Sequence, residues 1–184
     1  MRRVFVSEGA YGMRRWYVIG SMRILVHIGI AALSVWALFM QDFSPLAVSA
    51  VALFFVLHLI GIFHGKYSEV PVGDQMGAAV GSGRNMYDRL VHLAFGFLSS
   101  PLFYEFGLRI GVDDPWRYAF PAIMVLAVSA AFEIFEWANL VIRGDSDNEG
   151  PELQGDIWDT HKDMLLAGVG SLLFSAIQVA VSFI

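Results

Sequence analysis

Cysteine is absent from this 184-residue chain, and charged residues make up only 16% of it. Without cysteine there can be no disulfide, thiolate metal ligand or cysteine nucleophile. The formal net charge is −5, and the few lysines and arginines form no strongly basic cluster. Nucleic-acid binding rests on such clusters, so we expect no nucleic-acid partner.

Apolar residues, by contrast, make up 57% of the chain, and the mean hydropathy is +0.59. A helix needs about 20 mostly apolar residues to cross a bilayer. Five stretches approach that length, and they predict spans at about 24–40, 46–63, 87–109, 117–142 and 164–184. A chain of this length is typical of one domain. The sequence therefore predicts an all-α, polytopic transmembrane helix bundle that forms a single integral membrane domain over residues 1–184.

The segment 1–23 differs from the spans because it is basic and amphipathic, with five arginines interleaved with aromatic residues. A cleavable signal peptide would have its apolar core soon after the basic residues and a small-residue cleavage site after that core. Here the first long apolar run begins only at Ile24. We interpret residues 1–23 as an amphipathic segment that lies in the membrane interface.

The distribution of lysine and arginine predicts the orientation, because cytoplasmic loops carry an excess of both. If the N-terminus is inside, ten of the twelve basic residues lie on the cytoplasmic side, and only Arg109 and Arg117 lie outside. We therefore expect the N-terminus in the cytoplasm and the C-terminus outside.

In this orientation nearly all ionisable residues of the spans collect at the cytoplasmic end. Residues three or four apart share one face of a helix. This spacing occurs in three pairs: Asp88 and His92, Glu133 and Glu136, and Asp159 and Asp163. Ionisable residues inside spans are functional candidates, because a carboxylate that faces lipid is costly. Asp156 alone has a second reading, as a solvated residue at the start of a helix.

Small residues continue these faces, at Gly96 in the third span and at Ala167, Ser171 and Ser175 in the fifth. Small residues let membrane helices approach closely. We therefore expect the cytoplasmic ends of the third, fourth and fifth spans to meet, with Gly96 and Ala167 in close contact.

Four motifs carry a resemblance to a known family: "HGKYSEVPVGD", "RNMYDRLVHLAFGF", "AAFEIFEW" and "GDIWDTHKDMLLAGVGSLL". Together they resemble the YjdF family of bacterial inner-membrane proteins, and their order is similar to that of the broader VanZ-like proteins. The resemblance covers about residues 55–175, whereas the first 50 residues match the family poorly. It implies an inner-membrane helix bundle and a polar site, and no particular activity.

The residue types of the polar site suit a divalent metal such as Mn, Fe, Zn or Mg. The predicted ligands come from three helices: Asp88, His92, Glu136, Asp159 and Asp163. Glu133 and Asp159 are the candidate catalytic carboxylates, one of which would act as general base towards a metal-bound water. Arg84, Arg89 and Lys162 are the candidate substrate-binding residues, because cations at this depth suit the phosphate of a lipid headgroup. One hypothesis is thus a metal-dependent enzyme that acts on membrane lipid.

Two other functional classes fit the same residues. A non-catalytic membrane partner or lipid-binding scaffold would use the polar cluster to hold its helices together. A proton- or metal-ion-coupled transporter would use the carboxylates and histidines as a relay. Against the transporter, the sequence shows no inverted repeat, and polar residues are scarce in the outer half. Assembly into a homo-oligomer or a larger membrane complex is compatible with all three classes.

Overall fold

The computed structural model describes residues 8–143 and 156–183, with side chains from residue 24 onward except those of residues 139, 140 and 143. All regular structure in these ranges is helical, which confirms the predicted all-α class. The elements are α1 (Glu8–Met40), α2 (Pro45–Phe63), the 3₁₀ turn η1 (Tyr67–Glu69), α3 (Pro71–Ala79), α4 (Tyr87–Arg109), α5 (Trp116–Arg143) and α6 (Asp159–Val181).

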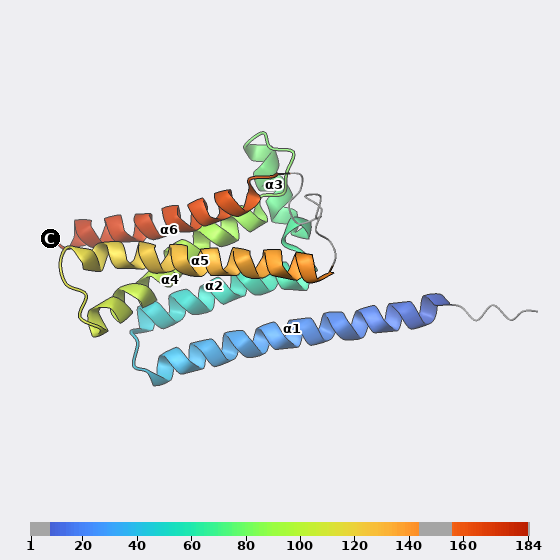
Figure 1. Ribbon diagram of the computed structural model, residues 1–184, viewed down its shortest axis with the longest axis horizontal. Helices are drawn as coiled ribbons and strands as arrows, with labels where there is room; N and C mark the ends of the chain where they lie inside the picture. Colours follow the sequence, from blue (N-terminus) through green and yellow to red (C-terminus); the bar gives the residue numbers. More distant parts are fainter. Residues whose placement is uncertain (1–7, 144–155, 184) are drawn as a thin grey trace, which may run out of the picture.

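The long helices run side by side, and successive ones point in opposite directions (Figure 1). Helix α4 packs against α2, α5 and α6, whereas α1 lies at the edge of the bundle and packs on α2. The short helix α3 covers one end of the bundle, near the start of α4 and of α6. This end is called the charged end below, because it holds the ionisable cluster formed by the first turns of α4 and α6.

Three helices of the described residues are long and apolar enough to cross a membrane, judged by length and composition: Pro45–Phe63, Trp116–Ala138 and Asp159–Val181. Ile24–Met40 in α1 is a shorter apolar stretch. Helix α4 is less apolar because many of its buried positions are small or polar and face other helices. The count of five spans therefore stays a prediction.

Helix α1 joins two parts of the chain that the sequence analysis treated separately. It is one continuous helix that includes residues 8–23 of the predicted interfacial segment and the first predicted span. Residues 1–7 of that segment lie outside the described residues.

Helices α4 and α6 touch through their backbones. A Cβ on Gly96 would overlap the carbonyl oxygen of Ala167, and one on Gly170 would overlap the carbonyl oxygen of Leu93. One turn beyond Gly96, the Ser100 and Ser171 hydroxyls are hydrogen-bonded at 2.7 Å. The predicted close contact of Gly96 with Ala167 is thus confirmed. It fixes the relative height of the two helices that carry most of the ionisable cluster.

The segment 64–86, which separates two of the predicted spans, contains η1 and α3. Pro71 begins α3, as suits a residue whose missing N–H would have no partner there. Asn85 then ties α3 to the start of α4, because its Nδ2 donates to the Val70 carbonyl at 2.9 Å and to Asp74 Oδ1 at 2.8 Å. The Tyr87 hydroxyl donates to the Leu57 carbonyl of α2 at 2.7 Å. These bonds hold the first turn of α4 in place.

The opposite end of the bundle has its own polar contacts, which we call the latch: Ser44, Glu105 and Arg109. Ser44 caps α2, and both its backbone N–H and its hydroxyl donate to the Glu105 carboxylate. The Arg109 guanidinium donates to the carbonyls of Gln41 and Asp42, each at 2.7 Å. The latch therefore ties the turn between α1 and α2 to the end of α4.

Candidate functional site

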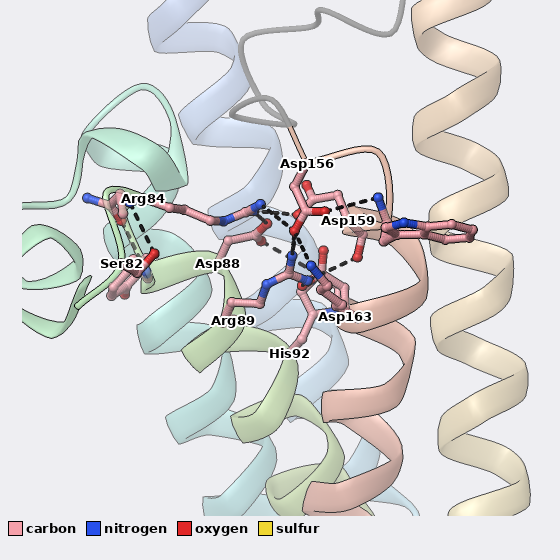
Figure 2. A network of polar contacts seen from close by, with 12 residues as sticks. Ser82, Arg84, Asp88, Arg89, His92, Asp156, Asp159 and Asp163 are labelled. Carbon is pink, nitrogen blue, oxygen red and sulfur yellow. Dashed lines mark hydrogen bonds and ion pairs between the residues drawn. The ribbon is translucent and has the colours of Figure 1, made fainter. Parts of the chain in front are cut away.

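Arg89 lies at the centre of the charged end and is only 6% exposed. Its Nη1 donates to Asp163 Oδ1 at 2.6 Å, and its Nη2 donates to Asp159 Oδ1 at 2.6 Å (Figure 2). Nη1 also donates to the Asp159 carbonyl at 3.0 Å. A guanidinium presents several donors in a rigid plane, so one arginine can bind two carboxylates at once. Arg89 thereby joins α4 to the first two turns of α6.

A second layer of ion pairs lies above Arg89, closer to the edge of the bundle. Arg84 Nη2 is 2.5 Å from Asp159 Oδ1, and Arg84 Nη1 is 3.5 Å from Asp156 Oδ2. Lys162 Nζ donates to Asp156 Oδ2 at 2.7 Å. The Lys162 ammonium, with help from the Trp158 N–H and the Arg89 charge, holds the pKa of Asp156 below its usual value. Asp156 is therefore ionised at neutral pH and belongs to the cluster.

Three residues beneath these ion pairs form a group suited to a metal ion. One ligand atom from each of Asp88, His92 and Asp163 lies within 4.8 Å of the others. His92 Nε2 is 3.6 Å from Asp88 Oδ1, four residues earlier on α4. His92 and Asp163 are buried, and Asp88 is partly buried. Two carboxylates and one imidazole are a donor set suited to Mn²⁺, Fe²⁺ or Zn²⁺. We call these residues the metal trio.

Glu133 reaches the metal trio from α5. Its Oε1 is 3.7 Å from His92 Nε2, and the residue is 7% exposed. Among the described residues this buried oxygen has no hydrogen-bond partner, although the Glu133 side chain is hydrogen-bonded to Thr160 of α6. A buried acceptor without a partner is costly, so an atom left in this state indicates a water, an ion or a proton at that position. The open oxygen lies directly beside the metal trio.

Among the residues that the structure describes, negative charge exceeds positive charge in the cluster. Five described carboxylates and three described permanent cations meet there: Asp88, Glu133, Asp156, Asp159 and Asp163 with Arg84, Arg89 and Lys162. Carboxylates that crowd together in a low-dielectric region cannot all stay ionised without compensation. A divalent cation, or two protons, would balance the two remaining charges. The acidic excess therefore leaves room for a bound metal even though two arginines are present.

The structure brings nearly all the site residues predicted from the sequence to one end of the bundle. Three of the five predicted metal ligands, Asp88, His92 and Asp163, form the metal trio. Asp159 lies outside the trio and is bound by both arginines. Glu136 also lies outside the trio. Glu136 is partly buried on α5, three residues beyond Glu133. Arg84, Arg89 and Lys162 each form an ion pair with an aspartate of the cluster, and their substrate-binding role stays a prediction.

Two residues that shape the site were missed by the sequence analysis. Asn85 orients the start of α4 through hydrogen bonds to Val70 and Asp74, and Thr160 is hydrogen-bonded to Glu133. Asn85 lies just before the predicted span 87–109, and polar residues are common at such positions whether or not they shape a site. Thr160 is a single hydroxyl among aspartates. Neither carries a sequence signal that separates it from ordinary loop residues.

Comparison with known proteins agrees with this architecture. Residues 5–182 match a family described as "Predicted membrane protein (DUF2238)". The chain is also 32% identical over 131 residues to the "Inner membrane protein YjdF" of Escherichia coli (strain K12), which covers 70% of this chain. That match spans 62% of the length of the relative. No solved structure matches the chain.

The family match begins at residue 5, so it extends over residues 5–50, which we judged to resemble the family poorly. The relative and the three candidate spans together support a location in the inner membrane. The chain is therefore an integral membrane protein that belongs to the family described as "Predicted membrane protein (DUF2238)".

Proposed function

We propose that the charged end binds one divalent cation and that the protein is a metal-dependent hydrolase of phosphate-bearing lipid headgroups. One observation carries this proposal: Asp88, His92 and Asp163 hold ligand atoms within 4.8 Å of one another in a protein-lined, mostly buried position. The acidic excess supports it, because a cation relieves the repulsion among carboxylates that the arginines leave uncompensated. Facing helices that project carboxylates and histidines inward are a common way to build such centres.

The neighbouring residues suit hydrolysis. Glu133 is placed to accept a proton from a water molecule beside the metal trio, because its Oε1 is buried, unpartnered and 3.7 Å from His92. Lys162 is 51% exposed at the rim, where its ammonium can contact a headgroup phosphate. Arg89 is buried against the aspartates of α6, so we assign it the role of holding the two helices together.

We further propose that the site faces the cytoplasmic leaflet, with the N-terminus inside and the C-terminus outside. The charged end contains Arg84, Arg89 and Lys162, which agrees with the excess of basic residues on the cytoplasmic side of membrane proteins. Reporter fusions at the C-terminus should score as periplasmic. A cytoplasmic score would place the site at the outer leaflet instead.

The metal site is tested by measuring the metal content of protein purified in detergent without chelators. We expect about one divalent ion per chain in the wild type and at least a tenfold lower content in His92→Gln. Asp113→Asn is the matched control, because Asp113 is exposed in the connection between α4 and α5. An equal metal content in wild type, His92→Gln and protein-free buffer would overturn the proposal.

Hydrolysis is tested separately with mixed micelles of phospholipid and metal-loaded protein, with headgroup release measured by mass spectrometry. We expect Glu133→Gln to bind metal and release at least a hundredfold less headgroup, since the amide cannot accept the proton. Release at the wild-type rate by Glu133→Gln would contradict the role of Glu133.

One observation favours a second candidate, a non-catalytic membrane scaffold. Arg84 and Arg89 form ion pairs with four aspartates, which is how a buried polar cluster locks helices together. A scaffold of this kind would hold a partner in a homo-oligomer or a larger membrane complex. It predicts no bound metal together with a higher-order assembly of the wild type in mild detergent.

A further inference from the structure

A groove lies beside the turn between α1 and α2, at the end of the bundle opposite the charged end (Figure 1). Its volume is about 600 Å³, within the range of sites that hold a small molecule. Most of its lining is apolar and comes from the end of α1, the turn and the start of α2: Phe39, Met40, Phe43, Pro45, Val48 and Ala52. Because Val48 and Ala52 are one turn apart on the same face of α2, the groove extends along that helix.

The end of the groove at the turn, which we call its mouth, lies at the depth where lipid headgroups begin. Two of the candidate spans, Pro45–Phe63 and Trp116–Ala138, start at this end of the bundle. Trp116 is 67% exposed there, and exposed tryptophan is typical of the boundary between the hydrocarbon core and water. In a bilayer the apolar lining therefore faces acyl chains, and the mouth faces headgroups.

Two opposite charges border the mouth without pairing with each other. The Arg109 guanidinium donates to the carbonyls of Gln41 and Asp42, each at 2.7 Å, and lies 3.9 Å from the centre of the Phe43 ring. Asp42 lines the groove and is exposed. Within the described parts of the chain, neither the guanidinium nor the Asp42 carboxylate forms an ion pair. Each charge is therefore open to a partner from outside the chain.

Arg109 keeps donors for such a partner while it serves the latch. A guanidinium has five N–H groups, and the two carbonyls use two of them. The other three suit the oxygens of a phosphate. Glu105, one turn earlier on α4, accepts from the N–H and the hydroxyl of Ser44, and its carboxylate forms no ion pair with Arg109.

The charges at the mouth favour one class of phospholipid. Arg109 stands there with two carboxylates, those of Asp42 and Glu105, so these three residues carry a net charge of −1. An anionic headgroup would meet Arg109 but also both carboxylates. A phosphate joined to a primary ammonium would contact Arg109 and Asp42 together, which makes its charges complementary to those of the mouth. A quaternary ammonium has no N–H to donate to Asp42.

We propose that this groove binds one zwitterionic phospholipid whose headgroup is a phosphate linked to a primary amine. The phosphate contacts Arg109, the ammonium contacts Asp42, and one acyl chain lies along Val48 and Ala52. The bound lipid then joins the turn between α1 and α2 to the end of α4 from outside the bundle. This site is at the opposite end from the metal trio and does not rest on the proposed hydrolysis.

The test is lipid binding to the purified protein in detergent, followed by native mass spectrometry. The probes are phosphatidylethanolamine, phosphatidylglycerol and phosphatidylcholine with identical acyl chains. We expect the wild type to bind phosphatidylethanolamine about fivefold more tightly than either of the other two, the effect of one ion pair at a partly exposed site. Equal affinity of the wild type for all three lipids would overturn the proposal.

Asp42→Asn is the informative variant for the headgroup. It removes the charge, and asparagine tolerates the left-handed backbone of this position, where φ is 54°. The variant should lose the preference for phosphatidylethanolamine over phosphatidylglycerol. Asp113→Asn is the matched control, because Asp113 is exposed and does not line the groove, and it should keep the wild-type preference. An unchanged preference in Asp42→Asn would overturn the proposal.

Ala52→Phe tests the apolar part of the groove. The larger side chain fills the groove away from the charges, so binding of all three lipids should weaken while their order stays the same. Ala176→Phe is the control, because Ala176 is exposed on α6 and outside the groove. Unchanged binding in Ala52→Phe would contradict the site. A preference that survives in Asp42→Asn and is lost in Lys162→Ala would place the lipid at the charged end instead.

Discussion

The two ends of the bundle use charged residues in different ways. At the latch, Glu105 and Arg109 meet backbone groups and one serine: Glu105 accepts from Ser44, and Arg109 donates to two carbonyls. At the charged end, side chains of like charge crowd together, and carboxylates outnumber cations.

This contrast separates polar residues that serve the fold from those that are candidates for function. The polar groups of the latch form hydrogen bonds with the turn between α1 and α2 and with the end of α4, and a structural role requires no more than that. The charged end has more carboxylates than its arginines and lysine can neutralise, and one of them, Glu133, has a buried oxygen without a partner. Excess and unsatisfied charge in an apolar setting is the feature that marks functional sites.

Among substitutions that test the difference between the two ends, we expect Arg89→Ala to cause the largest loss of stability. Removing the arginine leaves Asp159 and Asp163 buried without their closest cation, and breaking a buried ion pair in this way costs about 3–5 kcal/mol. Thermal unfolding in detergent, followed by circular dichroism, measures the loss. Arg109→Ala at the latch should cost clearly less, because its partners are partly exposed carbonyls; equal losses would remove the distinction between the ends.

A smaller loss is expected from Gly96→Ala, because its Cβ would overlap the Ala167 carbonyl and push α4 away from α6. Overpacking of this kind costs about 1–3 kcal/mol. It should also lower metal binding, since the metal trio takes ligands from both helices. Gly29→Ala on α1 is the matched control, because a Cβ there meets nothing within 4 Å. A stable Gly96→Ala protein with unchanged metal content would contradict the close packing.

Ser44→Ala tests the latch alone. It removes the hydroxyl that caps α2 and donates to Glu105, and loss of such a cap costs about 1 kcal/mol. Metal content should stay at the wild-type level, because the latch is at the other end of the bundle. A parallel loss of metal would show that the two ends are coupled.

The smallest effect is expected from Lys162→Ala, and it depends on pH. Lys162 lowers the pKa of Asp156 in the folded protein, so this contact stabilises the fold above the pKa of the unfolded aspartate. The contribution disappears as the pH falls through the lower, folded-state pKa. The variant should therefore be slightly less stable than wild type near pH 7 and equal to it in strong acid. Melting temperatures compared from pH 7 down to pH 2 measure the difference, and a constant gap would exclude the ion pair as its cause.

The helices and the meeting of ionisable residues at one end followed from simple sequence signals. Apolar length predicted the long helices, and the three- and four-residue spacing placed Asp88, His92, Asp159 and Asp163 on facing stripes. The close contact of Gly96 with Ala167 followed from residue size. These features depend on local periodicity, which a single sequence displays directly.

Other features depend on tertiary contacts that no local pattern encodes. The sequence did not predict the partners of Arg89, which are aspartates 70 and 74 residues away along the chain. Helix α3 lies in the segment that the sequence analysis left between two predicted spans, and its sequence, PVGDQMGAA, is short and contains two glycines. Hydrogen bonds from the Asn85 side chain to Val70 and Asp74 bind it to the start of α4. Both the partners of Arg89 and the contacts of α3 therefore depend on where side chains point in the folded protein.

The distance along the chain between Arg89 and its partners also bears on how the protein is made. At about 5–20 residues per second, roughly 4–14 seconds of synthesis separate α4 from the start of α6. During that interval Arg89 lacks Asp159 and Asp163, the two carboxylates that its guanidinium binds at 2.6 Å. The charged end therefore acquires these ion pairs only when α6 arrives, which makes the entry of the last helix the step that completes it.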